Sequence, residues 1–297
     1  MYQRKLRQVC SVLPPQLAAM VSQLPPEQEE QLEELRLRCG SEITMVCGGR
    51  EQPLSLTRPM LCTRDLLEHL VNLASSYSTY AVEECLRQGY LPLEGGHRLG
   101  LCGTAVVQDG RIATIKDISS VNLRVAGQYL GCATSLLDAL GPNPGNVLLV
   151  GPPGSGKTTL LRDMVRQLSD RLDQRVGVVD SRGEIAASVR GQPQMQVGRR
   201  TDVLTGVPKD QGLELLVRTM SPHWVAVDEI TAKADIRAMV RAGYCGVRLL
   251  ATAHAFGRED WQRRALYEKL RKRKIFTNLV FLDGKRRWTL ERVEEGC

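Results

Sequence analysis

Long hydrophobic runs are absent from the sequence. No apolar stretch approaches the roughly 18 residues that a membrane-spanning helix needs, and the segment from Met1 to Gln8 lacks the apolar centre of a signal peptide. Hydrophobic residues make up 42% of the 297 residues and charged residues 25%, as in globular proteins. These features predict a cytoplasmic protein with one large domain or two ordinary ones.

The sequence also lacks closely spaced pairs of cysteines, and it contains few aromatic residues. Nine cysteines are scattered singly, without a C-x-x-C pair, which favours reduced thiols over a disulfide or zinc framework. Only three Phe and three Trp occur, so few side chains are available for stacking on nucleic-acid bases. The net charge of +7 would suit a nucleic acid, an anionic membrane surface or an acidic protein, and charge alone does not choose among them.

A glycine-rich motif lies at the centre of the chain, after the apolar run 147–150. It matches G-x-x-x-x-G-K-[ST], the phosphate-binding P-loop. Its glycines let successive backbone N–H groups point inward at the start of a helix, where they bind anions. Lys157 would then reach the β- and γ-phosphates, and the Thr158 hydroxyl would bind Mg²⁺. The residues predicted to bind a nucleoside triphosphate are Gly151, Pro152, Pro153, Gly154, Ser155, Gly156, Lys157, Thr158 and Thr159.

Two later apolar runs end in acidic residues. The first ends in Asp180 and is followed by Arg182 and Glu184, and the second ends in Asp228 and Glu229. Strands that alternate with helices predict a parallel sheet, on which ligands bind at the carboxyl ends of the strands. We therefore expect all five residues on the phosphate side, with Asp228 as a Mg²⁺ ligand and Glu229 orienting the attacking water.

Two further candidates come from a strand end and a loop. A strand predicted over 247–252 leads to His254, which is either a sensor of the γ-phosphate or a satisfied core residue. Arg199 and Arg200 fall in a predicted polar loop, where arginines usually face solvent. If that loop lies beside the P-loop edge, Arg200 could reach the nucleotide of a neighbouring subunit.

The first half of the chain shows no catalytic grouping. Its patterns predict a small α+β domain with helices within 6–24 and over 63–73 and 80–88, and strands over 35–38, 43–46 and, in four pieces around an Asp109-Gly110 turn, 97–125. A predicted helix over 132–140 precedes a Gly- and Pro-rich stretch, so the boundary falls between 127 and 145. We expect domains over 1–135 and 136–297, the first positioning or regulating the second.

The last part of the chain is rich in basic residues. A solvated helix face explains such a run, and an anionic surface or a nucleic acid is the alternative. The scarcity of aromatic residues makes nucleic acid the less favoured partner. The residues are Arg263, Arg264, Lys269, Arg271, Lys272, Arg273, Lys274, Lys285, Arg286 and Arg287.

Several segments together resemble the stage III sporulation protein AA family of endospore-forming bacteria, which is similar to the secretion and pilus-motor ATPases. They are GPPGSGKTTLLRD, VVDSRGEIA, RTDVLTGVPKDQGLELLVRTMSP, VAVDEI and ATAHA, with GGHRLGLCG and ISSVNLRVAG in the first half. The resemblance implies an α/β fold: a RecA-like P-loop NTPase core with a mainly parallel sheet, preceded by a smaller α+β N-terminal domain.

The resemblance also implies roles for the strand-end residues. Asp180 and Glu184 match the acidic box of the secretion motors, Asp228 and Glu229 match their Walker B motif, and His254 matches their histidine box. Two departures are visible. The histidine box is reduced to Ala-Thr-Ala-His-Ala, and the acidic box begins with aspartate where many motors carry glutamate.

By the same resemblance, the protein is expected to form a ring, as a hexamer, with ATP and Mg²⁺ between subunits. Arg98 and Arg124 match first-domain arginines that approach a neighbour's nucleotide in related motors. The implied role is in the mother cell, powering or assembling a channel complex at the outer forespore membrane. Integral membrane proteins of that complex would be the partners and would attach the protein peripherally to the membrane.

The sequence is therefore compatible with three functions. The first is an oligomeric ATPase that energises a membrane-associated machine, with Lys157, Glu229, Glu184, Asp180, His254 and Arg182 as its catalytic residues. The second is a RecA-like ATPase stimulated by nucleic acid through the basic segment. The third is a nucleotide-gated scaffold that binds ATP and hydrolyses it negligibly.

Overall fold

The computed structural model describes residues 2–55, 57, 59–75 and 89–293. The chain divides into two compact units, residues 1–127 and 128–297. This division lies at the start of the 127–145 range expected for the boundary, because helix α6 (Thr134–Leu140) packs its leucines into the core of the second unit. The helix expected over 80–88 lies outside the described residues. Within the described part of the chain, no helix is long and apolar enough to cross a membrane.

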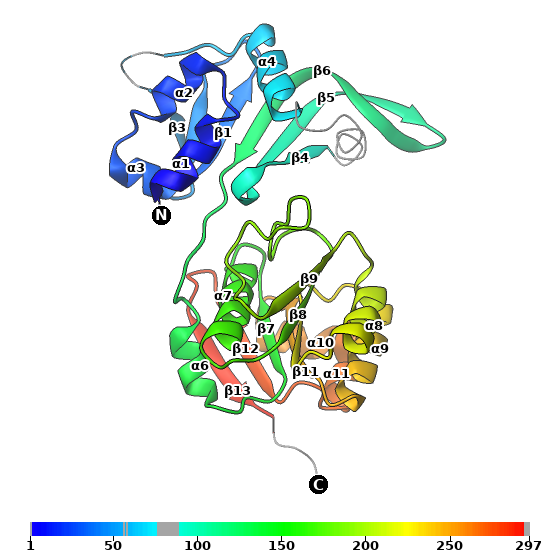
Figure 1. Ribbon diagram of the computed structural model, residues 1–297. Coiled ribbons are helices and arrows are strands. Elements are labelled where there is room, and N and C mark those ends of the chain that lie inside the picture. The colour runs from blue at the N-terminus through cyan, green and yellow to red at the C-terminus, as the bar shows by residue number, and fades with distance from the viewer. Residues whose placement is uncertain (1, 56, 58, 76–88, 294–297) are drawn as a thin grey trace. The chain divides into compact units, whose positions relative to one another are not determined.

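The first unit contains a six-stranded antiparallel sheet with the order β3-β2-β1-β6-β5-β4 (Figure 1). The strands are β1 (Leu32–Arg38), β2 (Thr44–Cys47), β3 (Arg50–Pro53), β4 (Tyr90–Pro92), β5 (Arg98–Gln108) and β6 (Arg111–Arg124). The helices are α1 (Tyr2–Cys10), α2 (Pro15–Val21), α3 (Pro26–Gln31), α4 (Arg64–Ser75) and the 3₁₀ turn η1 (Glu94–Gly96).

Alternation along the strands decides which face of this sheet is buried. Leu35 and Leu37 of β1 lie opposite Leu123 and Val121 of β6, and all four side chains are buried. They share a core with apolar residues of α1, α2 and α4. Because successive side chains point to opposite faces, Glu34, Arg36 and Arg38 of β1 place their charges on the other face.

Strands β5 and β6 form one long hairpin where the sequence predicted four short strands. The predicted Asp109-Gly110 turn joins them, with φ angles of 51° and 71°, as a type I′ turn requires. The register shifts after Cys102, and a Cβ at the neighbouring Gly103 would lie 2.4 Å from the carbonyl oxygen of Lys116. This bulge interrupts the alternation, which explains why the pattern indicated separate strands.

The second unit contains a seven-stranded sheet with the order β13-β12-β7-β11-β10-β8-β9. All described neighbours pair in parallel except β12 and β13, so the predicted mainly parallel sheet is confirmed. The strands are β7 (Val147–Gly151), β8 (Val176–Asp180), β9 (Thr201–Thr205), β10 (Trp224–Val227), β11 (Arg248–His254), β12 (Asn278–Leu282) and β13 (Trp288–Arg292).

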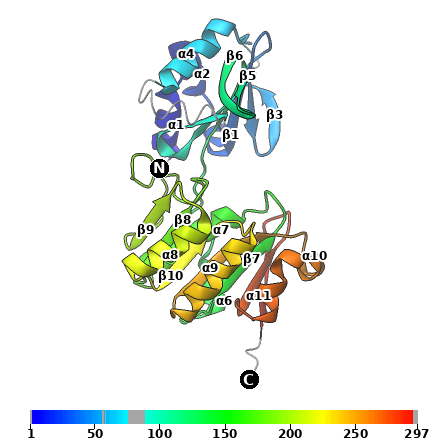
Figure 2. The same ribbon diagram turned by 90° about the vertical axis from the view of Figure 1, so that its right-hand side faces the viewer.

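Helices cover both faces of this sheet (Figure 2). One face is covered by α6 and α7 (Lys157–Asp170), and the other by α8 (Lys209–Met220), α9 (Lys233–Tyr244), α10 (Arg258–Arg263), the 3₁₀ turn η2 (Ala265–Tyr267) and α11 (Glu268–Lys272). Accordingly, Val147 and Leu149 of β7 lie in the core beneath α6 and α7, and Leu148 and Val150 lie in the core on the other face, beneath α8 and α9. Burial on both faces explains the unbroken apolar runs of these strands.

The strand order brings four functional strand ends together. Strands β7, β11, β10 and β8 are consecutive neighbours in the sheet and run in the same direction. Their carboxyl ends are therefore at one edge, as the alternating pattern predicted. The residues at that edge include Gly151 of β7, His254 of β11, Asp228 after β10 and Asp180 of β8.

Candidate functional site

The loop between β7 and α7 has the geometry of an anion-binding loop. Gly154 and Gly156 have φ angles of 74° and 89°, conformations that favour glycine. A Cβ at Gly151 would lie 2.7 Å from Ser155 Oγ and 2.9 Å from the carbonyl oxygen of Leu282, so this position also needs glycine. The loop leads into a 14-residue helix, whose first N–H groups and dipole attract phosphate.

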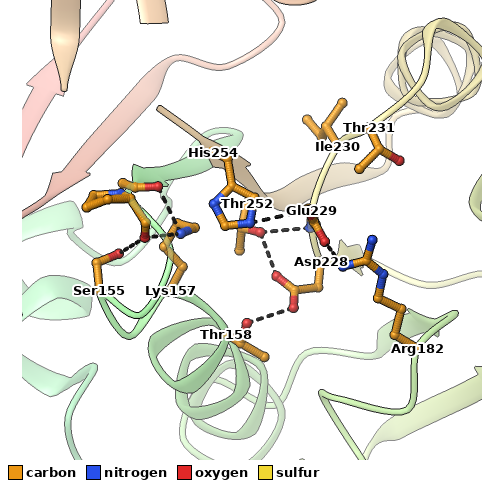
Figure 3. Close-up of polar contacts among 12 residues, drawn as sticks. Ser155, Lys157, Thr158, Arg182, Asp228, Glu229, Ile230, Thr231, Thr252 and His254 are labelled. Carbon is orange, nitrogen blue, oxygen red and sulfur yellow. Dashed lines mark hydrogen bonds and ion pairs between the residues drawn. The ribbon is translucent and has the colours of Figure 1, made fainter. Parts of the chain in front are cut away.

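Lys157 lies across this loop (Figure 3). Its Nζ donates hydrogen bonds to the carbonyl oxygens of Gly151 at 2.9 Å and Pro152 at 2.7 Å. Burial lowers the pKa of the Lys157 ammonium, and the charges of Asp228 and Glu229 oppose this shift. The cation is thus held within the loop, where a bound phosphate would meet it.

Asp228 connects the P-loop helix to β11. Its Oδ2 accepts a hydrogen bond from Thr158 Oγ1 at 2.7 Å, and its Oδ1 accepts one from Thr252 Oγ1 at 2.5 Å (Figure 3). Burial raises the pKa of Asp228, although the two hydroxyl donors act in the opposite direction. A carboxylate in contact with a hydroxyl provides two oxygen ligands of the kind that Mg²⁺ prefers.

Glu229 has a left-handed backbone conformation, with φ of 59°. A non-glycine residue adopts this conformation where its surroundings hold it. Its N–H donates to Thr252 Oγ1 at 2.8 Å, and Lys209 Nζ donates to its carbonyl oxygen. Its carboxylate pairs with Arg182 and lies 3.3 Å from His254 Nε2 (Figure 3).

His254, the last residue of β11, contacts the site through one ring nitrogen only. Its Nε2 faces Glu229, while its buried Nδ1 has no hydrogen-bond partner among the described residues. The His254 carbonyl oxygen accepts a hydrogen bond from the Tyr267 hydroxyl at 3.4 Å. His254 is therefore not a core histidine with all its polar atoms satisfied by the described residues, and its role as a sensor of the γ-phosphate stays a prediction.

Asp180 shapes the loop that follows β8. Its Oδ1 accepts hydrogen bonds from the backbone N–H groups of Glu184 at 2.8 Å and Ile185 at 3.1 Å, and its Oδ2 from that of Ala186 at 2.8 Å. The same loop is also bound by the buried Arg162 of α7, which donates hydrogen bonds to the carbonyl oxygens of Glu184 and Ile185, both at 2.6 Å. Asp180 and Arg162 together hold the segment that carries Arg182 and Glu184.

Arg98 and Arg124 lie directly opposite each other on β5 and β6. Arg124 Nε lies 3.6 Å from Glu34 Oε1, and the Arg98 guanidinium lies 5.1 Å from the ring centre of Tyr90. Like charges in direct cross-strand pairs are unfavourable without compensation. Arg124 therefore shares the carboxylate of Glu34 with Arg36, whose guanidinium lies 2.7 Å from Glu34 Oε2.

Arg200 lies at the opposite edge of the second sheet from the P-loop. It precedes Thr201, which begins β9 level with Val176, the first residue of β8. Its guanidinium pairs with Asp173 at 3.0 Å. The condition under which Arg200 could reach a neighbour's nucleotide, a 198–202 loop beside the P-loop edge, is not met, because β9 runs parallel to β8 and its first residues are at the amino ends of the strands.

Three cations of the basic segment form close ion pairs within their own helices or turns. Arg264 pairs with Asp260 at 2.8 Å, Lys272 with Glu268 at 2.6 Å and Arg287 with Asp283 at 2.8 Å. All three are i,i+4 pairs. They agree with the solvated helix face that the sequence allowed, and they weaken the case for a nucleic-acid groove.

Sequence reasoning missed three residues of the site: Arg162, Lys209 and Thr252. Thr252 is a polar residue in the otherwise apolar interior of a strand, Arg162 is a cation among buried residues of α7, and Lys209 is a buried cation at the start of α8. Each is a polar residue where the local pattern predicts burial. That signal could have marked them, although it does not name their partners.

Comparison with known proteins shows relatives whose similarity extends over most of the chain. Residues 3–290 match the family described as sporulation stage III, protein AA. The stage III sporulation protein AA of Bacillus subtilis (strain 168) is 37% identical over 282 residues, which cover 93% of this chain and 91% of that protein. Type II secretion system protein E of Pseudomonas aeruginosa is 30% identical over 184 residues, which cover 53% of this chain and 35% of that protein.

Solved structures show the same fold. The chain is similar to the Legionella pneumophila ATPase DotB, with a TM-score of 0.61 and 18% identity over 91% of this chain and 76% of that one. It is also similar to the pilus retraction motor PilT with bound ADP, with a TM-score of 0.59 and 16% identity over 86% of this chain and 75% of that one. These likenesses confirm the predicted RecA-like fold. The chain belongs to the sporulation stage III, protein AA family.

Proposed function

We propose that this protein binds ATP with Mg²⁺ and hydrolyses it as an oligomer. The observation that carries the proposal is the convergence of Lys157, Asp228, Glu229 and His254 at one edge of the parallel sheet. They come from three neighbouring strand ends, and the network of Thr158 and Thr252 connects them. Glycine at the strained and crowded positions of the loop fits a phosphate chain laid against the backbone.

Each side chain of the site has a task in this reaction. Lys157 binds the β- and γ-phosphates, and Thr158 and Asp228 hold Mg²⁺, which when bound offsets phosphate charge. Glu229 orients the attacking water and accepts its proton at a carboxylate oxygen. His254 and Arg182 contact the two carboxylate oxygens of Glu229 and aim them. Asp180 and Glu184 act through the loop that carries Arg182.

We further propose that the active form is a ring, as a hexamer, in which Arg98 or Arg124 of one subunit contacts the nucleotide of the next. The match of these two residues to first-domain arginines of related motors, and their position opposite each other on β5 and β6, support such a role. In the mother cell, such a ring would power or assemble a channel complex at the outer forespore membrane, attached through integral membrane proteins. Family membership and the likeness to secretion ATPases support this setting.

Two substitutions test hydrolysis. Lys157→Ala removes the phosphate ligand, and we expect it to abolish both ATP binding and turnover. Glu229→Gln keeps the shape of the side chain but removes the base, and we expect binding to persist while turnover falls by about 10²- to 10⁴-fold. Binding of a fluorescent ATP analogue and phosphate release would be measured for each variant.

Controls use exposed residues of the same types. Lys233→Ala and Glu259→Gln should match the unsubstituted protein, since both residues are exposed. Full turnover by either Lys157→Ala or Glu229→Gln would rule out the assigned roles. Turnover per subunit should rise with protein concentration if the site is completed by a neighbour, and a flat dependence would argue against the ring. DNA or RNA added at physiological salt should not stimulate turnover.

A nucleotide-gated scaffold is the second candidate function. The observation that favours it is the engagement of both Glu229 carboxylate oxygens by Arg182 and His254, because an engaged carboxylate is less free to accept a proton. Single-turnover measurement with excess protein separates the two functions. Conversion of bound ATP in one fast phase supports the ATPase, whereas bound ATP that persists unhydrolysed supports the scaffold.

A further inference from the structure

The backbone of Glu229 needs an explanation of its own. Strand β10 ends at Val227, and two residues later the chain turns into the left-handed region at φ 59°. For a residue with a side chain this conformation is unfavourable, by about 1 kcal/mol or more. Something in the fold must therefore hold the peptide groups on both sides of the Glu229 Cα.

Two side chains hold these groups. On the amino side, the Glu229 N–H donates to Thr252 Oγ1 at 2.8 Å. On the carboxyl side, Lys209 Nζ donates to the Glu229 carbonyl oxygen and lies 3.4 Å from Thr231 Oγ1. The Thr231 backbone N–H donates in turn to Asp235 Oδ2 at 3.0 Å. The turn is thus connected from β11 and α8 to the start of α9.

Lys209 is placed for this contact by the start of α8. It is the first residue of that helix, after Pro208 with φ of −55°, and only 8% of it is exposed. A buried ammonium needs partners for its protons. Burial lowers the pKa of Lys209, the charge of Arg182 acts in the same direction, and Asp235, Glu229 and Asp228 oppose the shift. The ammonium is therefore surrounded mainly by acceptors.

We infer that Lys209 is a positioning residue for hydrolysis: its ammonium holds the left-handed turn at Glu229 and so aims the Glu229 carboxylate at the attacking water. Lys209 contacts the backbone carbonyl oxygen of Glu229, whereas Arg182 and His254 contact its carboxylate. The inference rests on the proposed ATPase function for its kinetic consequence. Its structural consequence, the rigidity of the turn, does not depend on hydrolysis.

The kinetic experiment compares Lys209→Met with Lys209→Arg in the full-length chain. Methionine keeps much of the apolar stem but removes the donors, so we expect kcat to fall by about 10- to 100-fold, the scale of a misplaced catalytic group. The KM for ATP should change by no more than about threefold, because the phosphate-binding loop is untouched. Arginine restores charge and donors and should recover part of kcat.

Lys233→Met is the matched control, since Lys233 is likewise the first residue of a helix but is exposed. It should leave both kinetic constants unchanged. A merely structural role of Lys209 would lower kcat in proportion to the folded fraction, and arginine would give no selective recovery. Either Lys209→Met with unchanged kcat, or a parallel loss of folding in both Lys209 variants, would overturn the inference.

Hydrogen–deuterium exchange provides a readout that is independent of hydrolysis. In Lys209→Met, the backbone amides of 229–232 should exchange at least about tenfold faster, because the turn opens more often. Amides of β7 and α7 should keep their rates. Unchanged exchange over 229–232 would overturn the inference even if turnover were lost. If the unsubstituted protein hydrolysed no ATP, the proposed function would fail, and this measurement would still decide the role of Lys209 at the turn.

Discussion

Among single residues, Thr252 joins the two acids that follow β10, Asp228 and Glu229. Its hydroxyl donates to Asp228 Oδ1 and accepts the N–H of Glu229. The side chain is fully buried on β11, between the strands that carry the P-loop and the acids. A hydroxyl is the smallest group that can donate and accept at once, so no apolar residue of similar shape can replace it.

Thr252→Val tests this contact with nearly the same volume. The change leaves the Glu229 N–H and one Asp228 oxygen without this partner, so we expect a loss of about 1–3 kcal/mol in the free energy of unfolding and a marked fall in kcat. Urea denaturation and phosphate release would measure the two effects. Thr252→Ser should retain most of both, and Thr219→Val on the exposed side of α8 is the control. Unchanged kcat in Thr252→Val would show that the bridge is dispensable.

At the scale of elements, the strands of the second unit form where their local sequence patterns predicted them. The sequences of the loops between them do not predict which residues the loops contact. The apolar runs before Asp180, Asp228 and His254 form strands β8, β10 and β11 as predicted. The loop after β8, by contrast, is held by Arg162 from α7. A helix pattern shows that Arg162 is near apolar neighbours, but not which loop its guanidinium binds.

Helix α8 shows how closely an element can be packed at one residue. A Cβ at Gly212 would lie 2.6 Å from Val179 Cγ1 of β8, and 3.0 Å from Val207 Cγ1. A real side chain there would push the helix away from the sheet. Since Lys209 is one turn earlier on the same helix, this close approach also sets how far the lysine reaches toward Glu229.

Gly212→Ala should therefore lower the free energy of unfolding by about 1–3 kcal/mol, because overpacking outweighs the better helix propensity of alanine. Gly243→Ala in α9 is the matched control, since nothing lies within 4 Å of its added Cβ. That change should be neutral or stabilise by up to about 1 kcal/mol. Urea denaturation of both variants measures the difference, and equal stabilities would mean that the helix moves freely to make room.

At the scale of the whole molecule, the contacts described above for Lys157, Asp228 and Glu229 join residues of the second unit. Its two hydrophobic cores, described among residues 128–293, are also made within that unit. The first unit has its own core of apolar residues from α1, α2, α4 and its sheet. Nucleotide binding should thus belong to the second unit, whereas the proposed completion of a neighbour's site would require the first.

A fragment of residues 128–297 should fold and bind an ATP analogue with the affinity of the full chain. Its turnover should lose the dependence on protein concentration, since Arg98 and Arg124 are absent. Calorimetric titration and phosphate release would measure binding and turnover. The double variant Arg98→Ala/Arg124→Ala in the full chain should behave like the fragment, and Arg111→Ala at the exposed hairpin tip should not. Concentration-dependent turnover by the fragment would contradict a role of the first unit.

The sequence by itself determined the P-loop, the order of strands and helices around it and the acids at two strand ends, because each depends on neighbours a few residues away. Only the tertiary structure decided that Thr252 bonds Asp228 across 24 residues, that Lys209 reaches the turned backbone of Glu229, and that Arg200 lies at the far edge of the sheet. These contacts follow from the strand order β7-β11-β10-β8. The spacing of residues along the sequence does not predict that order.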